Sequence, residues 1–574
     1  MAKAEATVEE LVGMIERGEL RLPEMQRRYV WRSTRVRDLL DSLYRGYPSG
    51  AILLWDTDED VPEQDFASVQ QVNPYASTRL LLDGQQRLTS LSAVIRGVPV
   101  NVRGRQKPIE LLFNLDHPDE LAVVTEVYEN GRGENGDDPE LDLEDSEADA
   151  PEDELQRRFE RMTFVVATKK LEQRPNWVKV TAVFQSDSDR PFLKRAGVTD
   201  LDDPRSEKYS QRLARLRAIR KYIYRMDILE RTLSYDEVTE IFVRVNSLGA
   251  KLRSSDLALA QITAKWRGAL KTFQSFEAEC AKEGFDLDLG LHLKNLVAFA
   301  TGQSRFKTVG GLSRRRLEDA WEDAVPAMEF AVNFLKSNVG IDSPVLLSSP
   351  FILVAVGYYG HQRDYQLGPT EAAALRQWVL LANVKGRYSR GSTETLLDQD
   401  LAALRDGGDT EDLMDRLRSQ VGRLDIAPED LAGRNQRSAL FKTMFLAFRA
   451  GGARDWRSNL VIALGHKGAQ HKLQFHHIFP KAVLKAAGYS PREADDIANL
   501  SFVGGKTNRL ISDTAPAAYL DDVLKKNGSF PFESQCIPTD KALLEVAAYQ
   551  DFLEERRALI STRLNAFLGM QPTA

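Results

Sequence analysis

Apolar residues in the first 262 positions of the chain alternate between two spacings. Over residues 8–18, and again from Thr34 onward, they recur every three or four positions, as in an amphipathic helix. Short apolar runs of strand length lie between and after these helices, and they occupy residues 20–23, 51–55, 78–83, 164–167 and 177–180. This part of the chain is therefore predicted to be a mixed domain of helices and strands.

The spacing changes near residue 263. From there to residue 450 it is almost entirely helical, with short breaks at Gly and Pro. Gly451 and Gly452 then precede a third region, whose last part, residues 540–567, is again helical. The pattern predicts an α+β multidomain protein with an all-helical middle part, and its three parts are residues 1–262, 263–450 and 451–574.

Composition narrows the class of protein. The chain has 574 residues, of which 43% are hydrophobic and 28% charged, as expected of a globular protein with sizeable cores. No apolar run reaches the length of a membrane span, and the N-terminus lacks the pattern of a signal peptide. The two cysteines, Cys280 and Cys536, lie far apart, which excludes a cysteine-based zinc site and a disulfide framework. We therefore expect a cytoplasmic protein with no membrane partner.

Charge is unevenly distributed along the chain. Because the net charge is -7, contact with nucleic acid requires local clusters of Lys and Arg. One such cluster lies within residues 205–230, on a predicted helix that ends in Tyr222-Ile223-Tyr224. Its arginines suit nucleic-acid binding, but a solvated helix face is the favoured interpretation. Residues 129–157 are acidic and rich in Gly, which predicts a mobile insertion.

The segment from Thr78 to Leu91 is a first candidate site, because an apolar strand runs into a polar turn and then a helix. Gly84 in the turn allows a ligand to approach the backbone closely, and the free N–H groups at the start of the helix favour an anion. Arg87, one turn into the helix, could add a bidentate contact to a phosphate. The alternative is that Arg87 binds Asp83 or another carboxylate of the loop, and composition alone does not separate the two.

A second candidate site lies in residues 466–512, which hold four of the seven histidines of the chain. His476 and His477 end a predicted strand, Asn499 lies in a turn, and Asn508 lies in a predicted helix. Hydrolysis of a phosphodiester needs a base to activate water and a metal to hold the phosphate. An imidazole serves either purpose near neutral pH, and the amide oxygen of Asn is a hard ligand suited to Mg²⁺.

The run His476-His477-Ile478-Phe479-Pro480, followed by Asn499 and Asn508, resembles the signature of HNH (His-Me finger) nucleases in its H-N-N form. The resemblance implies a ββα-metal fold in which His477 is the general base. It assigns His476 and Asn508 to the metal, Mg²⁺ or Mn²⁺, and gives Asn499 the support of the catalytic loop. Ordinary strand histidines are the alternative, which the two asparagines and the proline disfavour.

Three N-terminal motifs carry a second resemblance. They are Gln26-Arg27-x-Tyr29-x-Trp31, Asp83-Gly84-Gln85-Gln86-Arg87 and Phe242-x-Arg244-x-Asn246-x-x-Gly249. In this order they resemble the N-terminal domain of the GmrSD family of modification-dependent (type IV) restriction enzymes, which is also similar to SspE. The family pairs a ParB/sulfiredoxin-like nucleotide-binding domain with a C-terminal HNH domain, so the resemblance covers residues 8–260 and 455–570.

The second resemblance implies that the N-terminal domain binds and hydrolyses a nucleoside triphosphate with Mg²⁺, and that modified DNA is the target. The residues that it assigns to the nucleotide phosphates are Asp83, Gly84, Gln85, Gln86 and Arg87. The residues that it places in the same cleft are Gln26, Arg27, Tyr29, Arg244 and Asn246. Arg28 departs from the family, in which a proline or a small residue is common after the Gln-Arg pair, and the acidic insertion has no counterpart there.

The predicted function is an NTP-regulated, Mg²⁺-dependent DNA endonuclease that nicks or cuts modified or foreign DNA in defence against phages. Two alternatives stay open: a nucleotide-responsive DNA-binding regulator with an inactive nuclease domain, and an RNA nuclease toxin. The sequence does not decide between GTP, UTP, CTP and ATP, or between glucosylated hydroxymethylcytosine and phosphorothioate as the modification. It also leaves open whether hydrolysis activates or restrains cleavage and whether the chain forms a homo-oligomer.

Overall fold

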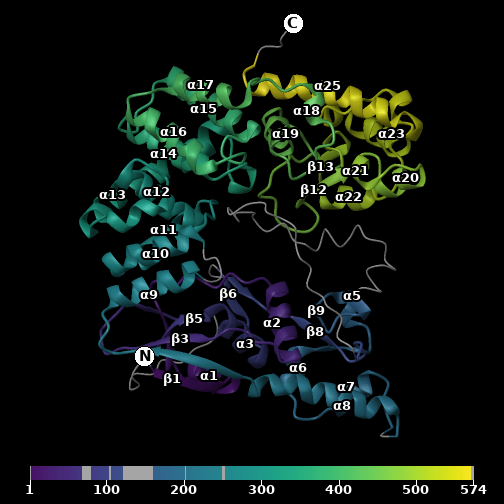
Figure 1. Ribbon diagram of the computed structural model, residues 1–574. Helices are drawn as coiled ribbons and strands as arrows, with labels where there is room; N and C mark the ends of the chain where they lie inside the picture. Colours follow the sequence, from purple (N-terminus) through teal and green to yellow (C-terminus); the bar gives the residue numbers. More distant parts are fainter. Residues whose placement is uncertain are drawn as a thin grey trace. The chain divides into compact units, whose positions relative to one another are not determined.

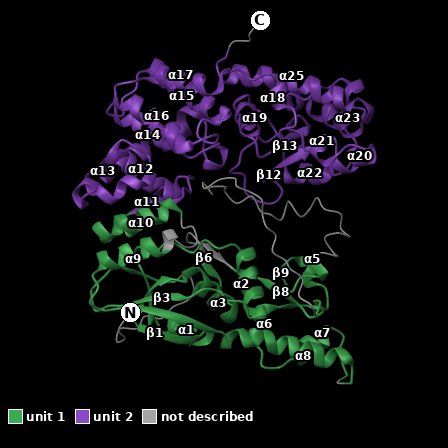
Figure 2. Cartoon of the chain, in the orientation of Figure 1, with its two compact units in different colours: residues 1–272 green, residues 273–574 purple. Residues whose placement is uncertain are grey.

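The structure is a computed structural model that describes residues 2–66, 79–102, 105–119, 159–200, 202–248 and 253–570. It divides into two compact units, residues 1–272 and 273–574 (Figure 2). The predicted acidic insertion, residues 129–157, lies outside the described residues. Among the helices that the structure describes, none is both long and apolar enough to cross a membrane.

Unit 1 is built around a mixed sheet. Within the described residues its strands run in the order β1-β11-β3-β5-β2-β4. Figure 1 labels β1, β3 and β5 of this sheet. These strands are β1 Ala2–Thr7, β2 Leu20–Pro23, β3 Ile52–Asp56, β4 Glu63–Gln64, β5 Arg79–Asp83 and β11 Ile223–Leu229. Two pairs, β11 with β3 and β2 with β5, are parallel, and the other neighbours are antiparallel.

Helices cover both faces of this sheet, because its central strands are apolar on both sides. Leu81 of β5 packs into one core with α1, α2 and α3, whereas its neighbours Leu80 and Leu82 pack into a second core with α9. The helices of unit 1 are α1 Val8–Glu16, α2 Ser33–Arg45, α3 Gln85–Arg96, α5 Lys169–Glu172, α6 Val180–Phe184, α7 Arg190–Arg195, α8 Pro204–Arg217, α9 Tyr235–Leu248 and α10 Ser254–Lys265. Two smaller sheets join β8 Leu111–Asn114 with β9 Phe164–Val166 and β10 Trp177–Lys179, and β6 Val100–Val102 with β7 Arg105–Lys107.

The helix that was predicted to end in Tyr222-Ile223-Tyr224 is longer than the observed helix α8. The α-helix ends at Arg217, a short turn follows, and the chain then enters β11. In β11, Tyr224, Met226 and Ile228 are buried while Ile223 and Arg225 are exposed, so the spacing there is that of a strand. The run of arginines before it obscured this alternation in the sequence.

The arginines of α8 form a solvated face only in part, because Arg205 and Arg215 are exposed while two others are engaged inside unit 1. Arg212 is buried and donates to the backbone oxygen of Leu115 and to Asp119. Arg217 donates to two backbone oxygens and to Asp189. Both arginines therefore hold unit 1 together, and nothing in these contacts favours the nucleic-acid interpretation.

Unit 2 begins with helices alone. Its first helices are α11 Ala269–Lys282, which spans the boundary between the units, α12 Leu289–Thr301, α13 Arg314–Phe334, α14 Phe351–His361, α15 Pro369–Lys385, α16 Thr393–Arg405, α17 Thr410–Val421, α18 Pro428–Leu431 and α19 Ala439–Ala450. Gly357 lets α14 approach α13 closely, since a Cβ atom there would lie 2.7 Å from the backbone oxygen of Ala327. The prediction of a mixed α+β chain with a helical region after the N-terminal part is confirmed.

The last part of unit 2 contains a two-stranded sheet and further helices (Figure 1). Its elements are β12 Leu473–His477, α20 Lys481–Ala486, α21 Pro491–Ala494, β13 Leu500–Gly504, α22 Gly505–Ile511, α23 Pro516–Asn527, α24 Phe530–Glu533 and α25 Tyr549–Phe567. Phe441 of α19 packs against Phe475 of β12 and Phe502 of β13, so this part and the helices before it share one compact unit. The predicted domain boundary at residue 450 stays a prediction.

Candidate functional site

The two histidines of the second candidate site lie at the end of β12, which pairs with β13 in an antiparallel register that places His476 opposite Ser501. The helix α22 follows β13 directly and packs against both strands. Asn508 lies in the first turns of this helix. Two strands and the helix after them thus bring His476, His477 and Asn508 into one small region.

His476 and Asn508 face each other. The Nδ1 atom of His476 lies 2.8 Å from the Oδ1 atom of Asn508, whose amide nitrogen donates to Gln474. Burial lowers the pKa of His476 to about 4, although the contact with Asn508 acts in the opposite direction. The imidazole is therefore neutral near pH 7, as a metal ligand must be.

His477 points to a different partner. Its Nε2 atom lies 2.8 Å from the Oδ1 atom of Asp495, and its side chain is 24% exposed. Asp495 also pairs with Lys481 at 3.0 Å. Burial raises the pKa of Asp495, but the hydrogen bonds from His477 and Lys481 outweigh burial and hold the pKa below its usual value. Asp495 is consequently an ionised acceptor beside the exposed histidine.

Asn499 is buried and holds the chain on both sides of this pair. Its Oδ1 atom accepts from the backbone N–H of Phe479, and its Nδ2 atom donates to the backbone oxygens of Phe479 and Ala494. Phe479 follows His477 by two positions, and Ala494 precedes Asp495. One amide thus fixes the segments of both partners, and the role of Asn499 in a catalytic loop stays a prediction.

In unit 1, side chains of the first two N-terminal motifs bind backbone groups and one another. Gln85 donates to a backbone oxygen of the loop at residues 27–31, at 2.9 Å, and Gln86 accepts from two backbone N–H groups of that loop. Gln26 donates to two backbone oxygens of β5, at 2.6 Å each. The hydroxyl of Tyr29 lies 2.8 Å from a serine hydroxyl of α3. These four side chains therefore fasten the loop to the start of α3.

Arg87 is also held inside unit 1. Its guanidinium donates to the backbone oxygens of Ser49 and Ala51 and to the carboxylate of Asp83, the last at 3.0 Å. The contact with Asp83 is the alternative that composition left open. Gly84 precedes the helix with a φ of 106°, and a Cβ atom there would lie 2.5 Å from the side chain of Ile52. Glycine is thus required at this turn for packing as well as for conformation.

The third motif is placed differently. Arg244 is exposed on α9 and pairs with Glu240 one turn earlier, at 2.6 Å. Arg27 of the first motif pairs with Asp256 of α10 at 2.7 Å. Asn246 lies in α9, but its side chain and all of Gly249 fall outside the part of the chain that the structure describes. The described contacts bring the first two motifs together and leave the place of the third open.

Unit 1 is similar to a known family of domains. Residues 8–263 match the GmrSD restriction endonuclease N-terminal domain. The match covers all three N-terminal motifs and ends inside α10, close to the end of unit 1. It supports a GmrSD-type restriction endonuclease, a class of enzyme that acts on DNA.

A comparison with individual proteins extends over both units. The chain is 22% identical over 552 residues to Uncharacterized protein MJ0686 of Methanocaldococcus jannaschii, an alignment that covers 90% of this chain and 86% of that protein. The similarity therefore includes residues of both units.

Asp495 was not among the residues singled out in the sequence. The available signal was an acidic residue four positions before Asn499, in the run Ala494-Asp495-Asp496-Ile497-Ala498-Asn499. This signal is weak, because an acidic residue near a turn is common on protein surfaces. The contact with His477 depends on how α21, which ends at Ala494, lies beside the end of β12, and the sequence pattern did not specify this.

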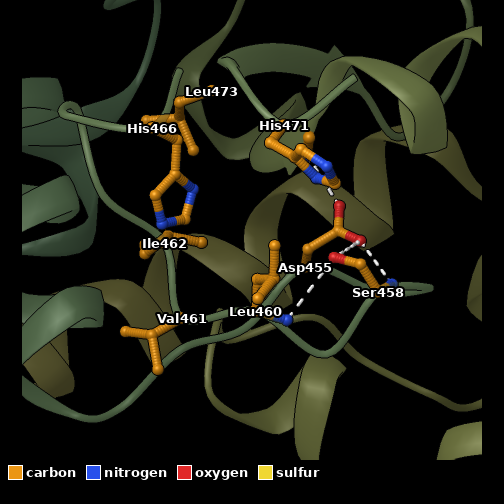
Figure 3. A pocket seen from close by; sticks show the side chains of 9 residues that line it. Asp455, Ser458, Leu460, Val461, Ile462, His466, His471 and Leu473 are labelled. Atoms are coloured by element: carbon orange, nitrogen blue, oxygen red, sulfur yellow. Dashed lines mark hydrogen bonds between the residues drawn. The ribbon is translucent and has the colours of Figure 1, made fainter. Parts of the chain in front are cut away.

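A small pocket lies beside the candidate site and not in it. Its lining residues include His466, His471 and Asp455 (Figure 3). Asp455 accepts hydrogen bonds from Gly504 and from the hydroxyl of Thr507, so it fastens the start of α22. Because the oxygens of Asp455 are engaged in this way, its role is structural. The other two histidines of the cluster at residues 466–477 do not join His476 and His477.

Proposed function

We propose that the chain is a DNA endonuclease of the restriction type whose C-terminal unit hydrolyses phosphodiester bonds with the help of a divalent metal. The observation that carries the proposal is the pair of contacts His476–Asn508 and His477–Asp495, which adjoin at the end of one strand. One pair offers two neutral metal donors, and the other offers an oriented imidazole beside them. The GmrSD-type domain supplies the second support, because it is a domain of restriction endonucleases.

The donor set fits a divalent metal such as Mg²⁺ or Mn²⁺. An amide oxygen only accepts hydrogen bonds, so the Nδ1 atom of His476 carries the hydrogen in its contact with Asn508 Oδ1. A metal would take the place of that hydrogen between the imidazole nitrogen and the amide oxygen, and both are ligands that Mn²⁺ accepts. A bound metal would stabilise negative charge on the phosphate. Since neither His476 nor Asn508 carries a negative charge, we infer that metal binding is weak until the DNA phosphate contributes its own oxygens.

The remaining residues have roles in the chain itself. His477 is exposed enough to take a proton from water, and Asn499 keeps the segments around it in place. In this reading neither residue binds the metal. The same arrangement would act on RNA as well as on DNA, and the match to the GmrSD restriction endonuclease domain is what favours DNA.

Removal of either proposed metal ligand should weaken the use of the metal. In His476→Ala and Asn508→Ala the Mn²⁺ concentration for half-maximal cleavage of plasmid DNA should rise at least ~10-fold, because one ligand is lost. Metal titrations of cleavage measure this shift. His471→Ala, which removes an exposed histidine outside the site, should titrate like the wild type. Unchanged titrations in both ligand variants would contradict the assignment.

We further propose that the start of α3 binds the phosphates of a nucleoside triphosphate and that this event controls cleavage. Among the described residues no side chain caps the first turn of α3, which begins with the buried residues Gly84 and Gln85. Such a helix start favours an anion. Arg87, held by Ser49 and Asp83, would add positive charge at the same place.

Arg87→Ala tests this assignment. Nucleotide hydrolysis should be lost, and the free energy of unfolding of unit 1 should fall by about 1–3 kcal/mol, since two backbone oxygens and a carboxylate lose their donor. The matched control is Arg96→Ala at the other end of α3, which removes ion pairs with Glu9 and Glu16. The control should lose stability but keep nucleotide hydrolysis. Normal hydrolysis in Arg87→Ala would show that the start of α3 is not the nucleotide site.

One panel of experiments tests the function as a whole. The full chain is incubated with plasmid DNA that is unmodified, glucosylated at hydroxymethylcytosine, or phosphorothioated, with Mg²⁺ or Mn²⁺ and with each of GTP, UTP, CTP and ATP. Metal-dependent nicking or cutting that varies with modification and nucleotide supports the proposal. An absence of cleavage under every condition, with nucleotide-dependent DNA binding retained, would favour a regulator with an inactive nuclease domain.

A further inference from the structure

We propose that Asp495 is a positioning residue that holds the proton of His477 on Nε2 and so makes Nδ1 the atom that accepts a proton from water. The inference rests on the proposed nuclease function and names the reacting atom of its base. The observation behind it is the 2.8 Å contact between His477 Nε2 and Asp495 Oδ1.

The chemistry of the contact decides the position of the proton. An ionised carboxylate can only accept hydrogen bonds, so the nitrogen that faces it must carry the hydrogen. A neutral imidazole has one N–H group, and with that hydrogen on Nε2 the lone pair is on Nδ1. The Nδ1 atom of His477 has no hydrogen-bond partner among the described residues, and the side chain is 24% exposed. The free nitrogen is thus the one that is available to water.

The position of Asp495 is fixed by the chain around it. Its own N–H donates to the backbone oxygen of Pro491, and α21 before it begins with a capping box between Ser490 and Glu493. The backbone oxygen of Ala494 accepts from Asn499. Because Asn499 also binds Phe479, two residues after His477, the histidine and its acceptor are anchored to the same amide. A carboxylate on a free loop would not hold the ring in one orientation.

Lys481 is the other partner of Asp495. It pairs with the carboxylate at 3.0 Å, its side chain is 42% exposed, and it lies at the start of α20. The lysine shares the carboxylate with His477, so its removal should leave the histidine contact in place. Variants at these two positions therefore separate the loss of the histidine contact from the loss of an ion pair.

This arrangement supports the attack of a water molecule on the phosphate, with His477 as the base. A water O–H bond breaks, its proton goes to His477 Nδ1, and the oxygen forms a bond to phosphorus. The bond from phosphorus to the leaving oxygen breaks, and that oxygen takes a proton from solvent. His477 later returns its proton to solvent, while the proton on Nε2 stays between the ring and Asp495 throughout.

The first test determines which ring nitrogen of His477 carries the proton, and it requires no cleavage assay. The full chain is labelled with ¹⁵N-histidine, and its seven histidines are observed at alkaline pH, with His477 assigned from the His477→Ala spectrum. We expect the wild type to show His477 protonated on Nε2. In Asp495→Ala we expect a mixture of the Nε2-protonated and Nδ1-protonated tautomers. Lys481→Met should keep the wild-type form. A wild-type signal for a proton on Nδ1 would overturn the proposal.

The second test measures how substitutions at Asp495 change the cleavage of supercoiled plasmid DNA with Mn²⁺. In Asp495→Ala, kcat should fall about 10²-fold or more while KM stays within about twofold, since only the base is affected. Asp495→Glu should recover part of kcat. Asp521→Asn, at an exposed carboxylate that pairs with Lys541, should cleave like the wild type. Wild-type kcat in Asp495→Ala, with His477→Ala inactive, would refute the role of Asp495.

The two tests can contradict the proposed function and the role of Asp495 independently of each other. If His477→Ala cleaves at the wild-type rate, the proposed base is wrong, and the proposed site of cleavage fails with it. The spectrum of the wild-type histidine would still show whether Asp495 holds the proton on Nε2. If the spectrum shows the opposite form while His477→Ala is inactive, the proposed function stands and the role of Asp495 does not.

Discussion

His477→Ala should cleave plasmid DNA about 10²–10⁴-fold more slowly than the wild-type chain, because a general base contributes roughly that factor. His477 is the one imidazole of the site that is both exposed and oriented by a carboxylate, whereas His476 is buried and faces Asn508. Nicking assays over a range of DNA concentrations measure the loss, which should fall on kcat.

The variant should remain folded. The His477 side chain fills no core, and its loss removes one hydrogen bond from Asp495, which keeps Lys481 as a partner. Nucleotide hydrolysis belongs to unit 1 in our proposal and should be unchanged. His471→Ala is the matched control, since it removes an exposed histidine six positions earlier. Cleavage by His477→Ala at close to the wild-type rate would refute the assignment of the base.

Much of the fold could be predicted from hydrophobic spacing. The strand before Gly84 and the helix after it appear where the apolar run and the helical spacing place them. The strand β11 was missed, because its alternating residues directly follow an arginine-rich helix. The strand β1 was missed as well: Ala2–Thr7 is mostly exposed and carries little apolar signal.

The candidate site was predictable in part. The sequence named His476, His477 and Asn508, and the pairing of β12 with β13 brings them together. Asp495 could not be named, because its contact depends on how α21 lies beside the end of β12. The roles of Gln85 and Gln86 were also out of reach, since both bind the backbone of a loop more than fifty residues away. A motif indicates that a set of residues acts together, but not whether each one binds a ligand or the protein.

Arg556→Met should destabilise unit 2 by about 3 kcal/mol or more. Arg556 is fully buried in α25 and donates to three backbone oxygens, those of Ala498, Gln535 and Cys536. Burial lowers the pKa of its guanidinium to about 10, so it stays charged at neutral pH. Methionine fills much of the volume but leaves the three oxygens without a donor, and each buried unpaired group costs about 1–3 kcal/mol.

The loss should reach the candidate site, because Ala498 directly precedes Asn499. When its oxygen loses Arg556, the turn that holds Phe479 and Asp495 loses one of its anchors. Thermal and denaturant unfolding measure the stability, and plasmid nicking well below the melting temperature measures the site. Arg556→Lys keeps the charge but cannot reach three oxygens in a fork, so its loss should be intermediate. Glu555→Ala, an exposed neighbour on the same helix, should melt like the wild type. An Arg556→Met chain that melts like the wild type would show that α25 does not depend on this arginine.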